Sequence, residues 1–358
     1  AEFSFDITHK EYPSAKSYLI FCGVGNNAGD GYLLASQIIR KGLHASVIYL
    51  SSPENLKGDA LSAYLDLKSL NAEITPWTKN CNFDADIIVD ALFGIGLNKP
   101  IEGKYLECIS AINDNVKPVI ALDIPSGLCA NTGQEKDLAI KAEITVTFVG
   151  KKIGLFLGSG PDSCGRIFFS DLLINENLYK LSKPSVEIFS DELRAKMLPK
   201  RKNTSHKGDY GHVLIIGGNK GMAGAAKIAA EGALRSGAGL VSVITRPENV
   251  NVITRLRPEI MCHAVDDSLN NVKELINNVD VIAIGPGLGL DEWAHKIYEE
   301  TLISKTPLIL DADALNILSL KPIKRDNWIL TPHPGEAAKL ISKLTSQIQH
   351  ERLSSLEE

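Results

Sequence analysis

The stretch Ser17-Tyr18-Leu19-Ile20-Phe21-Cys22 runs directly into Gly23-Val24-Gly25-Asn26-Asn27-Ala28-Gly29-Asp30-Gly31, and these residues decide the fold. The first part is a short apolar run that predicts a buried strand, and the glycines after it predict a tight turn. Across residues 31–42 the apolar residues recur at helical spacing, so a helix is expected after the turn. This is the strand–turn–helix start of an α/β domain.

The same alternation continues through the first half of the chain. Strand-like apolar runs that end in turn residues occupy 44–50, 85–94, 117–127 and 144–150, and residues 61–70 have a helical pattern. Near-continuous apolar strands separated by helices indicate a parallel sheet that is covered on both faces.

The pattern lapses over 187–209, which is polar and basic, and the cluster Lys196, Lys200, Arg201, Lys202 and Lys207 favours a solvated linker over a phosphate site. Strand-like and helical segments then resume. The sequence therefore predicts an α/β protein with two doubly wound domains. We place a Rossmann-like three-layer domain at 1–188, a linker and the start of the second domain at 189–208, and the rest of the second domain at 209–358.

Composition narrows the classes of function. The chain has 358 residues with 38 Lys plus Arg, 43 Asp plus Glu and a formal net charge of −5. It lacks the basic surface typical of a nucleic-acid binder, and no apolar run reaches the roughly 18–20 residues that cross a bilayer. The six cysteines form no C-x-x-C pair, which favours buried thiols in a reducing compartment. We predict a cytoplasmic homo-oligomer that binds small molecules, without nucleic-acid or membrane partners.

The turn at 23–31 admits two interpretations. Read as G-x-G-x-x-A, it is a weak dinucleotide-binding fingerprint whose helix offers free N–H groups to an anion. Against ordinary NAD binding, the next strand ends in Leu50-Ser51-Ser52 with no acidic residue for a ribose. Asn26, Asn27 and Asp30 also add polar side chains that such a turn does not need. The plain alternative is a tight turn with Asp30 near a helix N-terminus.

Two further strand ends in this half carry polar residues. Asp90 and the glycine loop 94–100 follow one strand, and Asp123-Ile-Pro-Ser126-Gly follows the next. Ligands bind outside the carboxyl ends of parallel strands, so these side chains are expected to meet. The oxygen-only set Asn27, Asp90 and Ser126 suits a hard cation, and neither zinc nor copper. An acid followed by a glycine loop and Lys99 suits a phosphate-bearing ligand.

The second half repeats this arrangement with different turns. Residues 217–224 are glycine-rich but do not satisfy the Walker A pattern, while 285–289 can expose N–H groups as an anion nest. Asp311 and Asp313 close one strand. His333, held between two prolines at another strand end, is expected to touch a ligand, although a lone histidine is more often structural.

In this order the motifs resemble a known family. G-x-G-N-N-x-G-D-G, D-A-L-F-G-x-G and D-I-P-S-G resemble NAD(P)HX epimerase. H-K-G-x-x-G-x-V, A-L-R-S-G-A-G-L-V, G-P-G-L-G, D-A-D-A-L-N and T-P-H-P-G-E resemble ADP-dependent NAD(P)HX dehydratase, which has a ribokinase-like fold. Fused in this order, they are similar to the bifunctional enzymes that repair nicotinamide cofactors hydrated at ring carbon 6, and the resemblance covers nearly the whole chain.

The resemblance implies an epimerase in the first half that interconverts the R and S hydrates. It assigns K⁺ to Asn27, Asp90 and Ser126, and we assign Asp123 as the acid/base group that protonates the departing oxygen and deprotonates the returning water. The implied contacts to the hydrate are Asn26, Asn27, Ala28, Gly29, Asp30, Gly94, Ile95, Gly96, Leu97, Asn98, Lys99 and Pro100, with Asp123 beside them.

Three positions depart from the family pattern. The family has Gly where Ala28 stands, Thr where Ile95 stands and Arg where Lys99 stands. Alanine tolerates positive φ less well than glycine, isoleucine removes a hydroxyl, and lysine lacks the bidentate fork for a phosphate. A weakened epimerase is therefore expected, with the cation ligands intact.

For the second half, the resemblance implies a dehydratase that uses ADP, with Mg²⁺ as an allowed companion, to phosphorylate the C6 hydroxyl. Ala225, Gly287 and His333 would hold the hydrate. The K-G-x-x-T segment for the nucleotide and the G-x-G-D segment with the catalytic base do not occur in these residues. We therefore expect an internal fragment that has an incomplete nucleotide site and no dehydratase activity. We expect it to end inside the helix after T-P-H-P-G-E and to lack most of the family's leading helix.

Two other hypotheses remain open from the sequence. The second domain fits a ribokinase-like small-molecule kinase, which would need the G-x-G-D segment. The first domain, given its three departures, fits a non-catalytic ligand-binding or lipid-carrier protein.

Overall fold

The computed structural model describes residues 1–97, 99–182, 184–198, 200–255 and 257–358. The chain splits into two compact units, Ala1–Ile188 and Phe189–Glu358. Among the helices of these described ranges, none is both long and apolar enough to span a membrane.

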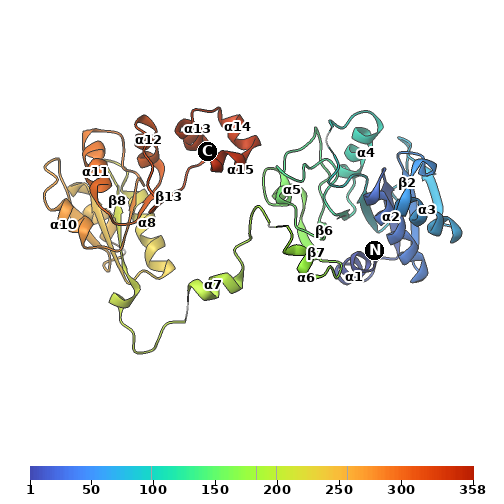
Figure 1. Ribbon diagram of the computed structural model, residues 1–358, viewed down its shortest axis with the longest axis horizontal. Coiled ribbons are helices and arrows are strands. Elements are labelled where there is room, and N and C mark those ends of the chain that lie inside the picture. Colours follow the sequence, from blue (N-terminus) through green and yellow to red (C-terminus); the bar gives the residue numbers. More distant parts are fainter. Residues whose placement is uncertain (98, 183, 199, 256) are drawn as a thin grey trace. The chain divides into compact units, whose positions relative to one another are not determined.

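A seven-stranded parallel sheet forms the first unit (Figure 1), in the order β3-β2-β1-β4-β5-β6-β7. The strands are β1 (Ser17–Cys22), β2 (His44–Tyr49), β3 (Glu73–Pro76), β4 (Ile87–Ala91), β5 (Val119–Leu122), β6 (Ile144–Phe148) and β7 (Arg166–Ser170). The helices are α1 (Glu2–Glu11), α2 (Asn26–Arg40), α3 (Gly58–Ser69), α4 (Lys104–Asn113), α5 (Gly160–Ser163) and α6 (Glu176–Tyr179), with 3₁₀ turns at Pro53–Asn55 and Ile153–Leu155.

Alternation along the strands builds a core on each face of this sheet. Ile20 of β1 and Val47 of β2 pack with Leu34 of α2 on one face. Leu19 and Phe21 point to the other face, where they join the cluster that α4 completes. Both faces of β1 are therefore buried, which explains why residues 17–22 are apolar throughout.

The second unit has a six-stranded parallel sheet in the order β10-β9-β8-β11-β12-β13. The strands are β8 (His212–Ile216), β9 (Leu240–Thr245), β10 (Met261–Ala264), β11 (Val281–Ile284), β12 (Leu308–Leu310) and β13 (Trp328–Leu330). The helices are α7 (Asp191–Met197), α8 (Ala223–Ser236), α9 (Val250–Thr254), α10 (Val272–Asn277), α11 (Glu292–Ile303), α12 (Ala312–Leu320), α13 (Pro334–Leu340), α14 (Thr345–His350) and α15 (Arg352–Glu357), with 3₁₀ turns at Lys207–Tyr210 and Pro247–Asn249.

The predicted fold class is confirmed, since each unit is a parallel sheet with helices on both faces. Strand β1 spans the predicted residues 17–22, and the other apolar runs also form strands. The sequence analysis missed β3, β7 and β10. Each lies at an edge of its sheet and is half exposed, so none carries a continuous apolar run.

Two local expectations are wrong. Helix α2 begins at Asn26, inside the segment predicted as a turn. Ala28 is therefore helical and does not adopt the positive φ that the sequence analysis expected at this position. The helix after T-P-H-P-G-E ends at Leu340, and α14 and α15 follow it before residue 358.

Candidate functional site

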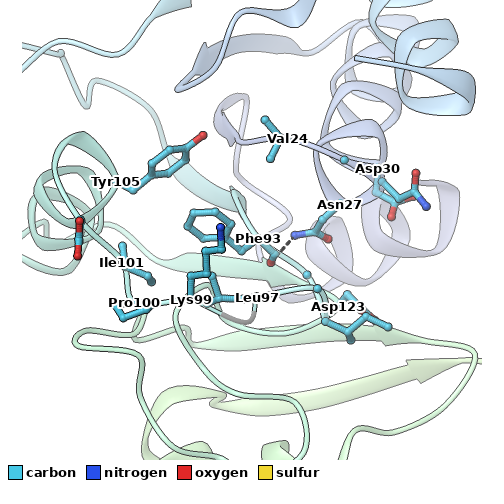
Figure 2. Close-up of a pocket in the computed structure, with 16 residues that line it drawn as sticks. Val24, Asn27, Asp30, Phe93, Leu97, Lys99, Pro100, Ile101, Tyr105 and Asp123 are labelled. Atoms are coloured by element: carbon cyan, nitrogen blue, oxygen red, sulfur yellow. Dashed lines mark hydrogen bonds between the residues drawn. The ribbon is translucent and has the colours of Figure 1, made fainter. Parts of the chain in front are cut away.

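The main candidate site lies where the strand order of the first sheet reverses. β1 is flanked by β2 and β4, so the loops after β1 and β4 diverge and leave a crevice at their carboxyl ends. A pocket of about 750 Å³ occupies this place (Figure 2). Its lining includes the predicted hydrate contacts Asn26, Asn27, Asp30, Gly94, Ile95, Gly96, Leu97, Lys99, Pro100 and Asp123.

Two predicted contacts lie away from the lining. Ala28 is fully buried in the core, and Gly29 faces α3, where a Cβ would come 2.9 Å from Ala60 Cα. The predicted contact Asn98 lies outside the described residues. The lining also includes side chains that the sequence analysis missed, namely Val24, Phe93, Ile101, Glu102 and Tyr105.

The start of α2 faces this pocket. Gly25 has φ +81°, and this left-handed turn lets the helix start at Asn26 directly after the strand. The first backbone N–H groups of a helix have no partner within it, so this end can bind an anion or a polar group. Asn26, Asn27 and Asp30 line the pocket from this end.

The oxygen cluster predicted from three separate strand ends is assembled. Ser126 donates from Oγ to Asp90 Oδ1 (2.6 Å) and from its backbone N–H to Asp90 Oδ2 (2.7 Å). The backbone of Phe93 connects Asn27 to this pair, because Asn27 Nδ2 donates to Phe93 O (2.8 Å) and Phe93 N–H donates to Ser126 Oγ (2.8 Å). Hydrogen bonds through the Phe93 backbone thus link the three residues, and of them Asn27 also lines the pocket.

One oxygen of this cluster lacks a partner. Asn27 Oδ1 is buried and accepts no hydrogen bond from the described part of the chain. Asp90 is fully buried, and burial raises the pKa of its carboxyl to about 6 against the opposing hydrogen bonds from Ser126 and Leu92. Within the described ranges, no group of three or more His, Cys, Asp or Glu side chains could hold a metal. The cluster is instead one carboxylate with neutral oxygens, which suits a weakly charged hard cation.

Asp123 stands at the end of β5 in an uncommon backbone conformation. Its φ is +67°, in the left-handed region, and its N–H donates to Val146 O (2.7 Å). The carboxylate Oδ1 accepts from Phe148 N–H (3.3 Å) and forms an ion pair with Lys152. Such strain persists where the surroundings fix it, which is common at functional sites. Lys152 lies 29 residues away in sequence, and no motif pointed to it.

A second carboxyl group shares the pocket with Asp123. Burial raises the pKa of Asp30, and the neighbouring Asp123 carboxylate raises it further. Figure 2 shows Asn27 and Asp30 on the same side of the pocket as Asp123. Two carboxyl groups in different surroundings are the usual basis for separate acid and base roles.

The other side of the pocket is aromatic and apolar. The rings of Phe93 and Tyr105 lie 4.8 Å apart between centroids, and Tyr105 Oη shares a hydrogen bond with Ser51 Oγ (2.8 Å). Ile95 is 63% exposed, so the position that carries a hydroxyl in the resembled pattern is open to a ligand. The pocket thus combines flat apolar walls, which suit a ring, with Lys99 and acidic side chains.

The second unit also brings two glycine loops together where its strand order reverses, between β8 and β11. A Cβ on Gly217 would lie 2.1 Å from Pro286 O, so only glycine allows this approach. The N–H of Asn219 donates to Gly287 O (2.7 Å). Ala225 lies beside Gly287, whose Cβ, if present, would be 3.2 Å from that of Ala225. The structure therefore brings two of the three predicted contacts together.

A buried arginine supports these loops, and the sequence analysis did not identify it. Arg246 is 6% exposed and lies over the ring of Trp293 at 4.7 Å. It donates to Asp267 Oδ1 (2.7 Å) and Asn219 Oδ1 (3.2 Å). In the sequence, only two features of Arg246 could have indicated this role, namely its charge and its position directly after a strand.

The side chain of His333 stabilises the start of helix α13. It caps α13, with Nδ1 accepting from Gly335 N–H (3.0 Å) and Nε2 lying 3.1 Å from Glu336 Oε1. Its side chain stays 67% exposed. Its recorded contacts in the described part of the chain reach neither Ala225 nor Gly287.

Comparison with known proteins matches both units. The family described as YjeF-related protein N-terminus matches residues 1–154, and the family described as NAD(P)H-hydrate dehydratase matches residues 213–357. The bifunctional NAD(P)H-hydrate repair enzyme Nnr of Coxiella burnetii is 39% identical over 99% of this chain and 72% of its own length. The enzyme of the same name from Escherichia coli is 38% identical over 98% of this chain and 68% of its own length.

Among solved structures, the ADP/ATP-dependent NAD(P)H-hydrate dehydratase of Bacillus subtilis, co-crystallised with ATP and Mg²⁺, is 31% identical. The match covers 47% of this chain and has a TM-score of 0.41. This chain spans only 60% of the length of that structure.

Proposed function

The chain belongs to the family of bifunctional NAD(P)H-hydrate repair enzymes, and on that premise we propose that its first unit epimerises the R and S hydrates of NADH and NADPH. The observation that supports this most is the pocket at the strand reversal, where Asp123 faces the same cavity as the start of α2. Relatives with both activities favour this function over a small-molecule kinase.

The reaction needs proton transfer at one oxygen. The ring nitrogen of the hydrate can expel the C6 hydroxyl, which leaves as water once it is protonated. Water then adds to C6 from the other face and gives up a proton. Asp123 is our candidate for the group that moves this proton, because it lines the pocket and its hydrogen bonds to the described residues all go to Oδ1.

The oxygen cluster below the pocket fits the proposed K⁺. Asn27 Oδ1 is buried without a partner in the described residues, and a buried oxygen left unpaired is costly. Asn27, Asp90 and Ser126 would hold the ion, which would supply positive charge between the loops. These three residues, tied together through Phe93, thereby fix the loop that begins at Gly94.

Further side chains are proposed to bind the hydrate. Lys99 would meet its phosphates as a point charge, without the bidentate fork of arginine. Phe93 and Tyr105 offer flat surfaces for a ring. For the second unit we propose an ADP-dependent dehydratase, with Mg²⁺ accompanying the nucleotide. Ala225 and Gly287, which lie side by side, would contact the hydrate, and His333 would reach it only with its exposed face, since the ring also caps α13. Homo-oligomeric assembly and a cytoplasmic location remain predictions from the sequence.

The test uses R-NADHX, the R hydrate of NADH, with separation of R and S forms by liquid chromatography. We expect the wild-type chain to speed epimerisation and Asp123→Ala to lower kcat by about 100-fold or more, the usual contribution of acid–base catalysis. Asp6→Ala, at an exposed position of α1, is the control and should retain full activity. Equal rates for wild type and Asp123→Ala would remove Asp123 from the mechanism.

A further inference from the structure

A largely buried lysine lies against the carboxylate of Asp123. Lys152 follows β6 and directly precedes the 3₁₀ turn Ile153–Leu155. Its side chain is 14% exposed, and that of Asp123 is 17% exposed. The ammonium donates to Asp123 Oδ1, to Thr147 Oγ1 (3.1 Å) and to Phe148 O (2.9 Å). An ammonium has three donors, so all three are used.

The hydrogen bonds to the Asp123 carboxylate all go to one of its two oxygens, Oδ1. Oδ1 receives Lys152, the backbone N–H of Phe148 (3.3 Å) and the hydroxyl of Thr147 (3.4 Å). Over the described residues, no hydrogen bond is recorded to Oδ2. One oxygen is therefore anchored to β6, while the other is free for a ligand in the pocket that Asp123 lines.

The charges around Asp123 come from three sides. Asp30 approaches from α2, Lys152 lies on the β6 side, and Lys99 reaches the pocket from the loop after β4. The neighbouring Lys151 points elsewhere, with its ammonium 5.7 Å from the ring centroid of Phe169. Burial makes ionisation of Asp30 harder by raising its pKa. Lys152 is thus the cation with a direct bond to Asp123 among the described residues.

We propose that Lys152 is a positioning residue for the epimerase, holding Asp123 as a carboxylate with Oδ2 directed at the reacting water. The inference rests on the proposed function. In the step from iminium to hydrate, the water oxygen bonds to C6, the C=N electron pair returns to the ring nitrogen, and Asp123 Oδ2 takes the water proton. In the reverse step Asp123 returns that proton to the departing oxygen. Lys152 transfers no proton and touches no substrate.

Lysine at this position has a predictable electrostatic effect. An opposite charge within about 4–6 Å favours the ionised form of a carboxyl group by 1–3 pH units. Lys152→Met removes this charge from Asp123 Oδ1. A purely structural lysine would instead change the amount of folded protein and lower the rate equally at every pH.

The experiment compares Lys152→Met, Lys152→Arg and the matched control Lys151→Met by their pH–rate profiles on R-NADHX. In Lys152→Met we expect the acidic limb of kcat to move up by about 1 pH unit or more. The rate loss should shrink at high pH, and KM should change little. Lys152→Arg keeps the positive charge, so the acidic limb of its pH–rate profile should stay near the wild-type position. The control Lys151→Met should have the same pH–rate profile as wild type. A uniform rate loss at every pH in folded Lys152→Met would overturn the proposal.

A second measurement separates this inference from the proposed function and from misfolding. In an Asp123→Asn background, Lys152→Met should cause no further rate loss, because a residue acting through Asp123 has nothing left to act on. An additional loss there would show that Lys152 acts independently of Asp123, against the proposal. If wild type itself fails to speed epimerisation, the proposed function fails first. Circular dichroism checks that each variant is folded.

Discussion

At the residue scale, buried polar atoms carry the most information about this protein. The sequence analysis identified Asn27, Asp90 and Ser126, because each directly follows an apolar strand, and the structure brings them together. It did not identify Lys152, whose role depends on a contact with Asp123 across 29 residues. The sequence shows which residues directly follow a strand, but it does not show which distant side chain contacts them in the folded protein.

Potassium should stabilise the folded first unit. A ligand that binds only the folded state at about 100 times its Kd adds roughly 2.7 kcal/mol, and the unpaired Asn27 Oδ1 offers the ion a place. We expect a higher Tm in KCl than in choline chloride at equal ionic strength, and a smaller difference in Asp90→Asn. An identical K⁺ effect in Asp90→Asn would contradict the assigned site.

At the scale of elements, the apolar pattern predicted strands and helices well, except at edges and at helix starts. The edge strands β3, β7 and β10 bury too few side chains to leave an apolar signature. Helix α2 starts early because Gly25 makes the turn alone, which leaves Asn26 and Asn27 inside the helix. Ala28 fits there as an ordinary helical residue, so its departure from the resembled pattern costs no backbone strain.

Helix α2 should tolerate no side chain at Gly31. A Cβ there would lie 2.6 Å from Ala91 Cβ and 2.8 Å from Cys22 Sγ, where the helix presses on β1 and β4. Gly31→Ala should therefore lower the free energy of unfolding by about 1–3 kcal/mol, as overpacking usually does. Gly150→Ala is the control, since a Cβ on Gly150 meets nothing within 4 Å. Urea unfolding measures both, and equal midpoints would disprove the close packing.

At the scale of the whole molecule, each unit has its own sheet and its own hydrophobic clusters. Ile20, Leu34 and Val47 belong to the first unit's core, and Ile216 and Trp293 to the second unit's core. Helix α7, which lies in the sequence between the last strand of the first sheet and the first strand of the second, buries no side chain. Two units with separate cores should each keep their fold when the chain between them is cut.

Limited trypsin digestion tests this organisation. Arg194 and Lys196 lie in the exposed helix α7, so the first cuts should fall there and release two resistant fragments. Mass spectrometry identifies the cut sites, and the double variant Arg194→Gln/Lys196→Gln should slow this cleavage. First cuts spread through the sheet strands of either unit would count against two independently folded units.

By itself, the sequence determined two doubly wound α/β units, the loops at their strand ends, and the family to which those loops point. It could do so because apolar periodicity and turn residues act over a few neighbouring positions. Only the tertiary structure decided that Lys152 meets Asp123, that Ser126 bonds to Asp90, and that Arg246 lies under the second unit's loops. Those encounters depend on the order of strands in each sheet and on packing between distant elements, and local sequence does not encode either.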